Sequence, residues 1–300
     1  MNKKILLATI ALMIITYTVF FNSNILSYGQ ENKTVYDKQQ IMNLYLLSKV
    51  FEKEIEKISD MVELVANSPE FQILDYNNVP QHYMSLYHGI PENEELDKRT
   101  IFKNIMDISP SISALFFLLP NGDNYLEEPY SYQLNLRKTN FSFRDYYSGA
   151  LDTGKMYMGN VIMSAASGIP ITIVAIPIYA QNLSNTAKTF GNNNTLIGLI
   201  GVDVNFKTFD DFLKSLPLGS NERVVFLDAI GNKIADSSKS NINNQTSLFS
   251  GLSSFKNALN GKTGNITEEF DKTKTEISYA PVKSIQNTWV LLWLKQYTNN

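Results

Sequence analysis

A repeat of apolar residues between Val35 and Ala66 constrains the fold of this chain more than any other feature. Apolar side chains recur there at steps of three and four residues, at Ile41, Leu44, Phe51, Ile55, Ile58, Val62 and Val65, with Ser48 in the one polar slot. This spacing is typical of an α-helix with a single apolar stripe. The segment has no glycine or proline, and Asn67-Ser68-Pro69 ends it. The sequence therefore predicts a long N-terminal helix within residues 30–69.

A helix of about thirty residues forms a rod of roughly 45–50 Å. A stripe of that length must be buried against more than one neighbour. Two arrangements satisfy this requirement, a spine shared by two stacked modules and a coiled coil between two copies of the chain. We favour the spine, and both arrangements can hold in the same protein, so a homodimer through the helix stays open.

Length and composition predict two compact units and exclude some classes of partner. The chain has 300 residues, of which 44% are hydrophobic, enough for more than one core. Its net charge is −3, and the one basic cluster is Lys3-Lys4, so nucleic acid is not expected as a partner. It has no cysteine, which excludes disulfides and thiolate chemistry.

The N-terminus predicts export. Asn2-Lys3-Lys4 precedes an apolar run from Ile5 to Phe21, a pattern that leaves the N-terminus inside and sends the rest of the chain across the membrane. We expect residues 1–29 to be a membrane anchor, which we favour, or a signal peptide cleaved near Gly29. In both cases the protein from about residue 30 is extracytoplasmic.

The first module is expected to occupy residues 70–206. Its elements are a helix at Leu96–Ile108, a buried strand at Ile112–Leu119, a tight turn at residues 120–123, a strand from Tyr125, a short helix at Phe141–Ala150, and strands at Met156–Met163, Ile169–Tyr179 and Leu196–Asn205. Residues 181–195 are polar and rich in asparagine, which predicts an exposed loop.

The second module is expected to occupy residues 207–300. Its elements are a helix at Phe209–Leu216, strands at Arg223–Asp228 and Lys233–Asp236, a loop at 237–250, a helix at Leu252–Leu259, and strands at Asn265–Phe270, Thr275–Pro281 and Trp289–Lys295. The repeated order predicts an α+β fold with two five-stranded antiparallel sheets and flanking helices.

Four residues suggest a binding site for a small molecule. On a short helix, Arg144 and Tyr147 would share a face, with Tyr146 at the rim. Asp203 falls at the end of an apolar strand, where a charged group needs a partner. Arginine can hold a carboxylate, aspartate an ammonium group, and tyrosines can wall the space between them. These residues are suited to a polar or zwitterionic ligand.

The same residues allow an internal explanation. Arg144 could pair with Asp203, or with Asp145 beside it, and the chemistry alone does not separate an ion pair from a pocket. No nucleophile, acid–base set or metal site assembles in the sequence, so we expect neither an enzyme nor a bound cofactor or metal.

Three segments resemble the double Cache sensor domains of chemoreceptors and sensor kinases. They are Phe143-Arg-Asp-Tyr-Tyr-Ser-Gly-Ala-Leu-Asp-Thr-Gly-Lys, Ile-Thr-Ile-Val-Ala-Ile-Pro-Ile-Tyr179 and Leu-Ile-Gly-Leu-Ile-Gly-Val-Asp203-Val. The resemblance covers roughly residues 35–298. It implies two PAS-like modules on a shared helix, with the ligand in the membrane-distal module. It also implies that Arg144, Tyr146, Tyr147 and Asp203 bind the ligand, as in amino-acid-binding members.

Two positions depart from that pattern, because Thr139 and Val161 stand where the family has tyrosines. They weaken the case for the family's usual amino-acid ligands, and the expected ligand is a small polar molecule of the amino acid, amine or carboxylate class. We therefore expect an extracytoplasmic sensory domain that lacks its own cytoplasmic transmitter and passes its signal to a separate protein. The alternative is a surface scaffold that keeps the Cache fold without a ligand.

Overall fold

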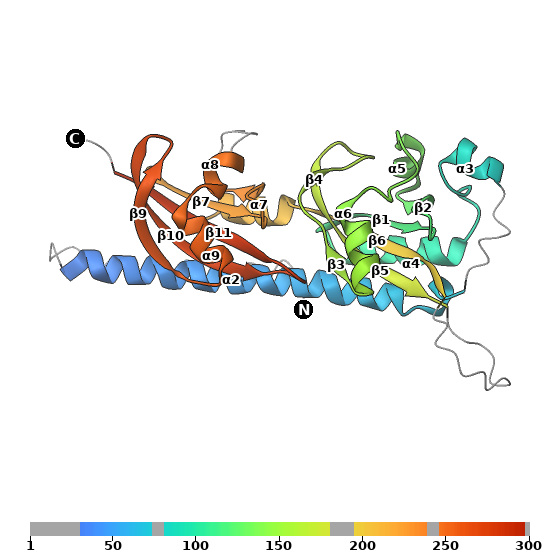
Figure 1. Cartoon of the computed structure of the whole chain (residues 1–300), viewed down its shortest axis with the longest axis horizontal. Helices are drawn as coiled ribbons and strands as arrows, with labels where there is room; N and C mark the ends of the chain where they lie inside the picture. The colour runs from blue at the N-terminus through green and yellow to red at the C-terminus, as the bar shows by residue number, and fades with distance from the viewer. Residues whose placement is uncertain (1–30, 74–80, 181–194, 239–245, 298–300) are drawn as a thin grey trace, which may run out of the picture.

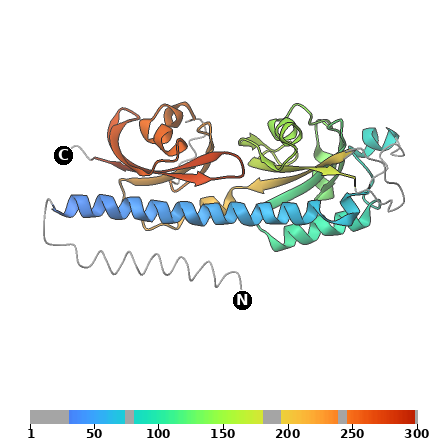
Figure 2. The same ribbon diagram turned by 60° about the horizontal axis from the view of Figure 1, so that its bottom comes forward.

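A computed structural model describes residues 31–73, 81–180, 195–238 and 246–297. One long helix, α2 (Glu31–Ala66, 36 residues), runs along both parts of the molecule (Figures 1 and 2). A short 3-10 turn, η1 (Pro69–Phe71), follows it. The predicted helix is confirmed. Segments 1–30 and 181–194, where the anchor and the exposed loop were predicted, lie outside the described residues.

The first module runs from α3 to β6 and is built on a six-stranded antiparallel sheet. Its helices are α3 (Gln81–Tyr87), α4 (Leu96–Ile108), α5 (Tyr130–Asn135) and α6 (Asp145–Thr153). Its strands are β1 (Ile112–Leu118), β2 (Asn124–Glu128), β3 (Tyr157–Met158), β4 (Ile162–Met163), β5 (Pro170–Tyr179) and β6 (Leu196–Asn205). The strand order is β2-β1-β6-β5-β3, and β4 also pairs with β5.

The second module runs from α7 to β11 and has a five-stranded antiparallel sheet, as predicted. Its elements are α7 (Lys207–Lys214), β7 (Glu222–Leu227), β8 (Lys233–Asp236), α8 (Thr246–Ser250), α9 (Ser253–Leu259), β9 (Gly264–Phe270), β10 (Thr273–Lys283) and β11 (Thr288–Gln296). The strand order is β8-β7-β11-β10-β9. The α+β class with two antiparallel sheets on a long helix is thus confirmed.

Both sheets turn one face toward α2, so a single core joins the helix to the two modules. Val62 and Val65 near the end of α2 belong to the same buried cluster as the side chains from β1, β5 and β6. Farther toward the N-terminus, the Phe51 ring lies 4.8 Å from the ring of Phe209 in α7 and 4.8 Å from that of Phe226 in β7. The spine arrangement therefore accounts for burial of the stripe.

Each sheet has a second face with its own covering. In the second module, α9 packs on β10 and β11, and its Phe255 belongs to a separate buried cluster. In the first module, α6 covers β5 and β3. The cluster beneath α6 includes Tyr146 and Phe116, and this face holds the site described below.

Several local predictions were wrong. The expected strand at Met156–Met163 is two short strands, because the N–H groups of Asn160 and Val161 donate to the carboxylates of Asp145 (2.8 Å) and Asp228 (3.1 Å) instead of to β5. The first sheet therefore has six strands rather than five. Helices η1, α3 and α5 were not predicted, and α8 occupies the end of the expected loop at 237–250.

Candidate functional site

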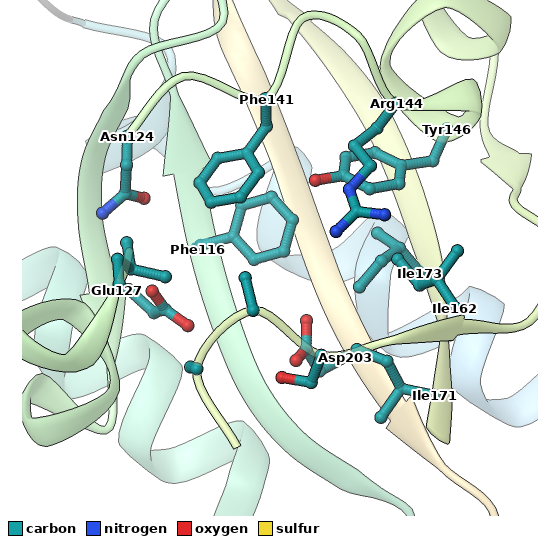
Figure 3. Close-up of a pocket in the computed structure, with 14 residues that line it drawn as sticks. Phe116, Asn124, Glu127, Phe141, Arg144, Tyr146, Ile162, Ile171, Ile173 and Asp203 are labelled. Atoms are coloured by element: carbon teal, nitrogen blue, oxygen red, sulfur yellow. The ribbon is translucent and has the colours of Figure 1, made fainter. Parts of the chain in front are cut away.

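A cavity lies on the face of the first sheet that is turned away from α2, between the sheet and the start of α6 (Figure 3). Its volume is about 30 Å³. Because side chains alternate between the two faces of a strand, β1 contributes Phe116, β5 contributes Ile171 and Ile173, and β6 contributes Asp203. The walls are thus largely apolar, with a few polar groups pointing inward.

Gly201 makes room for the aromatic ring at the base of this cavity. It pairs with Phe116 across β1 and β6. A Cβ atom on residue 201 would lie 2.0 Å from the ring of Phe116. The outer end of the ring, at Cζ and the two Cε atoms, therefore occupies the space where a Cβ of residue 201 would lie, a position that only a glycine allows.

Asp203 is held in the cavity by strand pairing on both sides. It lies opposite Ala114 of β1 and Ile173 of β5, so its backbone cannot turn the side chain away. The residue is 5% exposed. Burial raises the pKa of the Asp203 carboxyl to about 7, and a hydrogen bond with Ser164 opposes that rise. Asp203 therefore titrates close to neutral pH.

Arg144 enters the cavity from the opposite side (Figure 3). It is the N-cap of α6 with an extended backbone (φ −83°, ψ 145°), so it precedes the helix. Its guanidinium lies over the ring of Phe143, 5.1 Å from the ring centre. Within the described part of the chain, the guanidinium has no ion pair and no hydrogen bond. It is therefore available to an anionic group.

The internal ion pairs that the sequence allowed are not formed between these described residues. No ion pair joins Arg144 to Asp203 or to Asp145. The Asp145 carboxylate accepts hydrogen bonds instead from the backbone of Tyr146 (2.8 Å) and from the backbone and side chain of Asn160 (2.8 and 3.0 Å). Asp145 therefore fixes the connection between β3 and β4 and does not contact the guanidinium of Arg144.

The two tyrosines have different positions. Tyr146 lines the cavity, and burial, with a further effect of Asp203, raises the pKa of its phenol. Tyr147 is not among the lining residues, and its hydroxyl donates a hydrogen bond to the carbonyl of Pro120 (2.7 Å). The expected shared face of Arg144 and Tyr147 is wrong because α6 begins at Asp145, after the arginine. Arg144, Tyr146 and Asp203 are brought together.

Glu127 and Asn124 of β2 also line the cavity, and sequence reasoning missed both. Three residues apart on a regular strand, they would face opposite sides. The pairing with β1 shifts at this point, from Phe117↔Leu126 to Leu118↔Asn124, so Tyr125 is an extra residue. This β-bulge turns Asn124 and Glu127 to the same face. The one available signal was the pair of acids Glu127-Glu128 in an otherwise buried strand.

Glu127 is a buried carboxyl directed toward Asp203 (Figure 3). Burial raises its pKa well above the usual range, and the carboxyls of Asp203 and Glu128 add to the rise. The cavity thus holds two carboxyl groups and one guanidinium. Such a set can bind a ligand that carries both an anionic and a cationic group.

A wider groove of about 590 Å³ adjoins the cavity. The two spaces share Phe141, Arg144 and residues 164–166, which therefore form the partition between them. Arg137 and Lys138 line the outer groove. The outer space is consequently cationic, whereas the inner cavity carries the acids.

The departures from the resembling family fall just outside the cavity. Neither Thr139 nor Val161 is among its lining residues, whereas Phe141 and Ile162 are. The carbonyl of Thr139 accepts a hydrogen bond from the N–H of Asn124 (2.7 Å), beside the bulge. Apolar side chains therefore stand near the places where tyrosines were expected.

Solved sensor domains share this fold. The ligand-binding domain of the amino acid chemoreceptor PctC of Pseudomonas aeruginosa PAO1, in complex with GABA, has a TM-score of 0.59 at 15% identity over 86% of this chain and 99% of that chain. The ligand-binding domain of the Campylobacter jejuni chemoreceptor Tlp3, in complex with 4-methylisoleucine, has a TM-score of 0.55 at 14% identity over 90% and 96%.

A third similar structure is the extracellular domain of the putative histidine kinase rpHK1S-Z16, with a TM-score of 0.56 at 14% identity over 89% of this chain and 95% of that chain. No curated protein sequence matches the chain.

Within the described residues, no helix is long and apolar enough to span a membrane. A family model described as a Cache domain matches residues 20–298, nearly the whole sequence. The chain therefore belongs to the double Cache family, as its sequence motifs indicated.

Proposed function

We propose that this protein is an extracytoplasmic sensory domain that binds a polar or zwitterionic metabolite in the first module. The observation that carries the proposal is that Arg144 and Asp203 line one cavity without forming an ion pair with each other or with another described residue. The Asp203 carboxyl has a hydrogen bond with Ser164 but no cationic partner among the described residues. Charged groups in an apolar interior are costly unless partnered. A ligand with an anionic and a cationic group would supply both partners.

In this arrangement Arg144 holds the anionic group and Asp203 the cationic or hydrogen-bonding group. Tyr146 packs against the ligand between them. The cavity of about 30 Å³ is smaller than the ~300 Å³ or more of typical ligand pockets. Binding therefore requires the partition at Phe141 and residues 164–166 to move outward and join the cavity to the groove.

The family and the similar structures support a sensory function. PctC is described as an amino acid chemoreceptor and was solved with GABA, and Tlp3 was solved with 4-methylisoleucine. At identities of 14–15% these structures support the fold of this chain and do not identify its ligand. We place the module boundaries at 70–206 and 207–300, and an N-terminal anchor at 1–29, as part of the same proposal.

A thermal-shift screen of the full-length chain in mild detergent tests the function. The panel contains amino acids, amines, carboxylates and purines. A ligand at ~100 times its Kd stabilises the folded protein by about 2.7 kcal/mol, which raises its melting temperature. Arg144→Ala and Asp203→Ala should each abolish the shift and remain folded.

Two results would contradict the proposal. One is a protein that no panel member stabilises, and the other is a stabilising ligand whose effect survives both substitutions. In the first case a scaffold that keeps the fold would be the better description. Recovery of a protein partner that binds the Arg144→Ala variant as well as the unmodified chain would then support the scaffold.

A further inference from the structure

The cavity has one more acidic group than its cations can balance. Arg144 faces two carboxyl groups, those of Asp203 and Glu127, which approach each other from β6 and β2 (Figure 3). The Glu127 side chain has neither an ion pair nor a hydrogen bond among the described residues. Its 4% exposure means that water cannot solvate it freely.

Apart from Asp203 in the same cavity, the other buried acids of the described chain have ion-pair or hydrogen-bond partners, which sets Glu127 apart. Its neighbour Glu128 pairs with Arg99 at 2.8 Å, and Asp236 pairs with Arg223 at 2.7 Å. Asp228 accepts four hydrogen bonds from N–H groups. The fold therefore satisfies its structural acids, and Glu127 serves no such purpose.

Asn124 provides an independent sign that the inner end of the cavity is built for a ligand. The residue is 1% exposed, and its Nδ2 donates to the carbonyl of His88 (3.0 Å), which fixes the orientation of the amide. Its Oδ1 is buried and has no hydrogen-bond partner. Figure 3 shows this oxygen turned toward the cavity, on the same side as Glu127. The Glu127 carboxylate and the Oδ1 of Asn124 are therefore two hydrogen-bond acceptors that have no donor among the described residues.

We propose that Glu127 and Asn124 form a second cation-binding position, and that the ligand is an amino acid with a basic side chain. This inference rests on the proposed function, since it assigns the carboxylate of the ligand to Arg144 and its α-ammonium group to Asp203. The side-chain ammonium or guanidinium then reaches Glu127 and the Oδ1 of Asn124. A ligand of this class carries one net positive charge, which balances two carboxylates against one guanidinium.

A basic ligand should also displace protons from Glu127 and Asp203 when it binds. Burial raises the pKa of both Glu127 and Asp203, and Glu128 beside Glu127 adds to the rise. Arg144 and Tyr146 are the other titratable groups that line the cavity. A cation that binds the two carboxylates must displace the protons they hold, so its affinity should rise between pH 5.5 and 8 and binding should release protons.

The test is isothermal titration calorimetry of the full-length chain in mild detergent. L-Lysine is compared with L-norleucine, which has an apolar side chain of similar length, and L-ornithine with L-norvaline. At pH 7.5 we expect the basic member of each pair to bind at least about 100-fold more tightly, as sites with unpaired buried polar groups reject apolar analogues. Titrations in buffers of different ionisation enthalpy measure the released protons.

Glu127→Gln separates the second position from the first. It should weaken binding of L-lysine by about 30-fold or more, since a charge-assisted bond is lost, and change that of L-norleucine by less than about 3-fold. Glu92→Gln, which replaces an exposed carboxylate of the same module, is the matched control and should change neither. Thermal unfolding of each variant checks that it folds. If Glu127→Gln does not fold, the second position is tested by two measurements on the unmodified chain. These are its preference for L-lysine over L-norleucine and the number of protons released on binding.

The outcomes distinguish this inference from the function on which it rests. Equal binding of L-lysine and L-norleucine, or binding of other panel compounds but neither basic amino acid, overturns the second position and leaves the sensory function standing. A preference for L-lysine that survives Glu127→Gln overturns the assignment to Glu127. If no compound in the broad panel binds, both the inference and the proposed function fail.

Discussion

Gln286 and Met158 are joined by two hydrogen bonds that connect the modules. The N–H of Met158 donates to Oε1 of Gln286 at 2.9 Å, and Nε2 of Gln286 donates to the carbonyl of Met158 at 2.6 Å. Gln286 lies in the turn between β10 and β11. Its side-chain amide pairs with the backbone of β3, the edge strand of the first sheet, as a neighbouring strand would. Nearby, the N–H of Val161 donates to the carboxylate of Asp228 at 3.1 Å.

The first prediction concerns this connection. Gln286→Ala removes both bonds and should lower the free energy of unfolding by about 1–2 kcal/mol, since each is worth about 1 kcal/mol. The amide of Met158 should also exchange with solvent faster, as measured by hydrogen exchange with mass spectrometry. Gln296→Ala, at the exposed end of β11, is the control. Unchanged exchange at Met158 would show that the turn does not hold β3.

The connection lies next to residues that line the cavity. Ile162 and Ser164 line the cavity and follow directly after the residues held by Gln286 and Asp228. Outward movement of residues 164–166 would therefore pull on a strand pair tied to the second module. A discrete contact of this kind is a physical means of coupling the two modules.

The second prediction concerns pH. The pKa of Asp203 is about 7 in the folded protein, above the ~4 expected in the unfolded chain. The folded state therefore binds the proton more tightly, and the resulting stability is present below pH ~4 and lost as pH rises through 7. Relative to Asp203→Asn, the free energy of unfolding of the unmodified chain should fall by on the order of 2–4 kcal/mol between pH 4 and 8.

Urea unfolding at a series of pH values measures this difference. The groups that face Asp203 in the cavity are Glu127, Arg144 and Tyr146, so Glu127→Gln should remove a further part of the pH dependence. Asp152→Asn, an exposed carboxylate on α6, is the control. Parallel curves for the unmodified chain and Asp203→Asn would mean that the Asp203 carboxyl ionises normally in the folded protein.

The third prediction separates the two tyrosines. Tyr147→Phe loses the bond to the carbonyl of Pro120 and should cost about 1 kcal/mol of stability without changing ligand affinity. Tyr146→Phe removes a hydroxyl inside the cavity and should weaken binding of any stabilising panel compound. Melting temperatures and titrations of both variants test this. A loss of affinity in Tyr147→Phe equal to that in Tyr146→Phe would contradict the placement.

Much of the fold follows from local patterns in the sequence. The stripe of α2 is periodic over many residues, and β1, β5 and β6 are nearly continuous apolar runs, so each indicates its element without knowledge of the partners. The division of Met156–Met163 into β3 and β4 depends instead on Asn160 and Val161, whose N–H groups donate to carboxylates of distant residues. Such tertiary bonds leave no periodic trace.

Some residues of the candidate site can likewise be predicted from the sequence, and others cannot. Arg144, Tyr146 and Asp203 stand out because charged or polar groups interrupt apolar segments. Glu127 does not, because its direction is set by the bulge at Tyr125, and the bulge is a property of the pairing between β1 and β2. The sequence therefore indicated three of the polar residues that line the cavity, whereas the second carboxyl group, and with it the charge balance, is evident only in the structure.

The last prediction concerns the base of the cavity. In Gly201→Ala the new methyl group would lie 2.0 Å from the ring of Phe116, so the ring must shift into the space beside Asp203. Overpacking of this kind costs about 1–3 kcal/mol. The shifted ring should also block ligand binding, which titration with a stabilising panel compound measures. The double variant Gly201→Ala/Phe116→Leu replaces the ring by a smaller side chain. It should recover part of the lost stability, because the clash is with the aromatic ring. Gly219→Ala, where the nearest atoms are 3.3 Å away, is the control and should be nearly neutral. A stable Gly201→Ala protein with full affinity would mean that β6 can move away from β1, and that Phe116 does not fix the depth of the cavity.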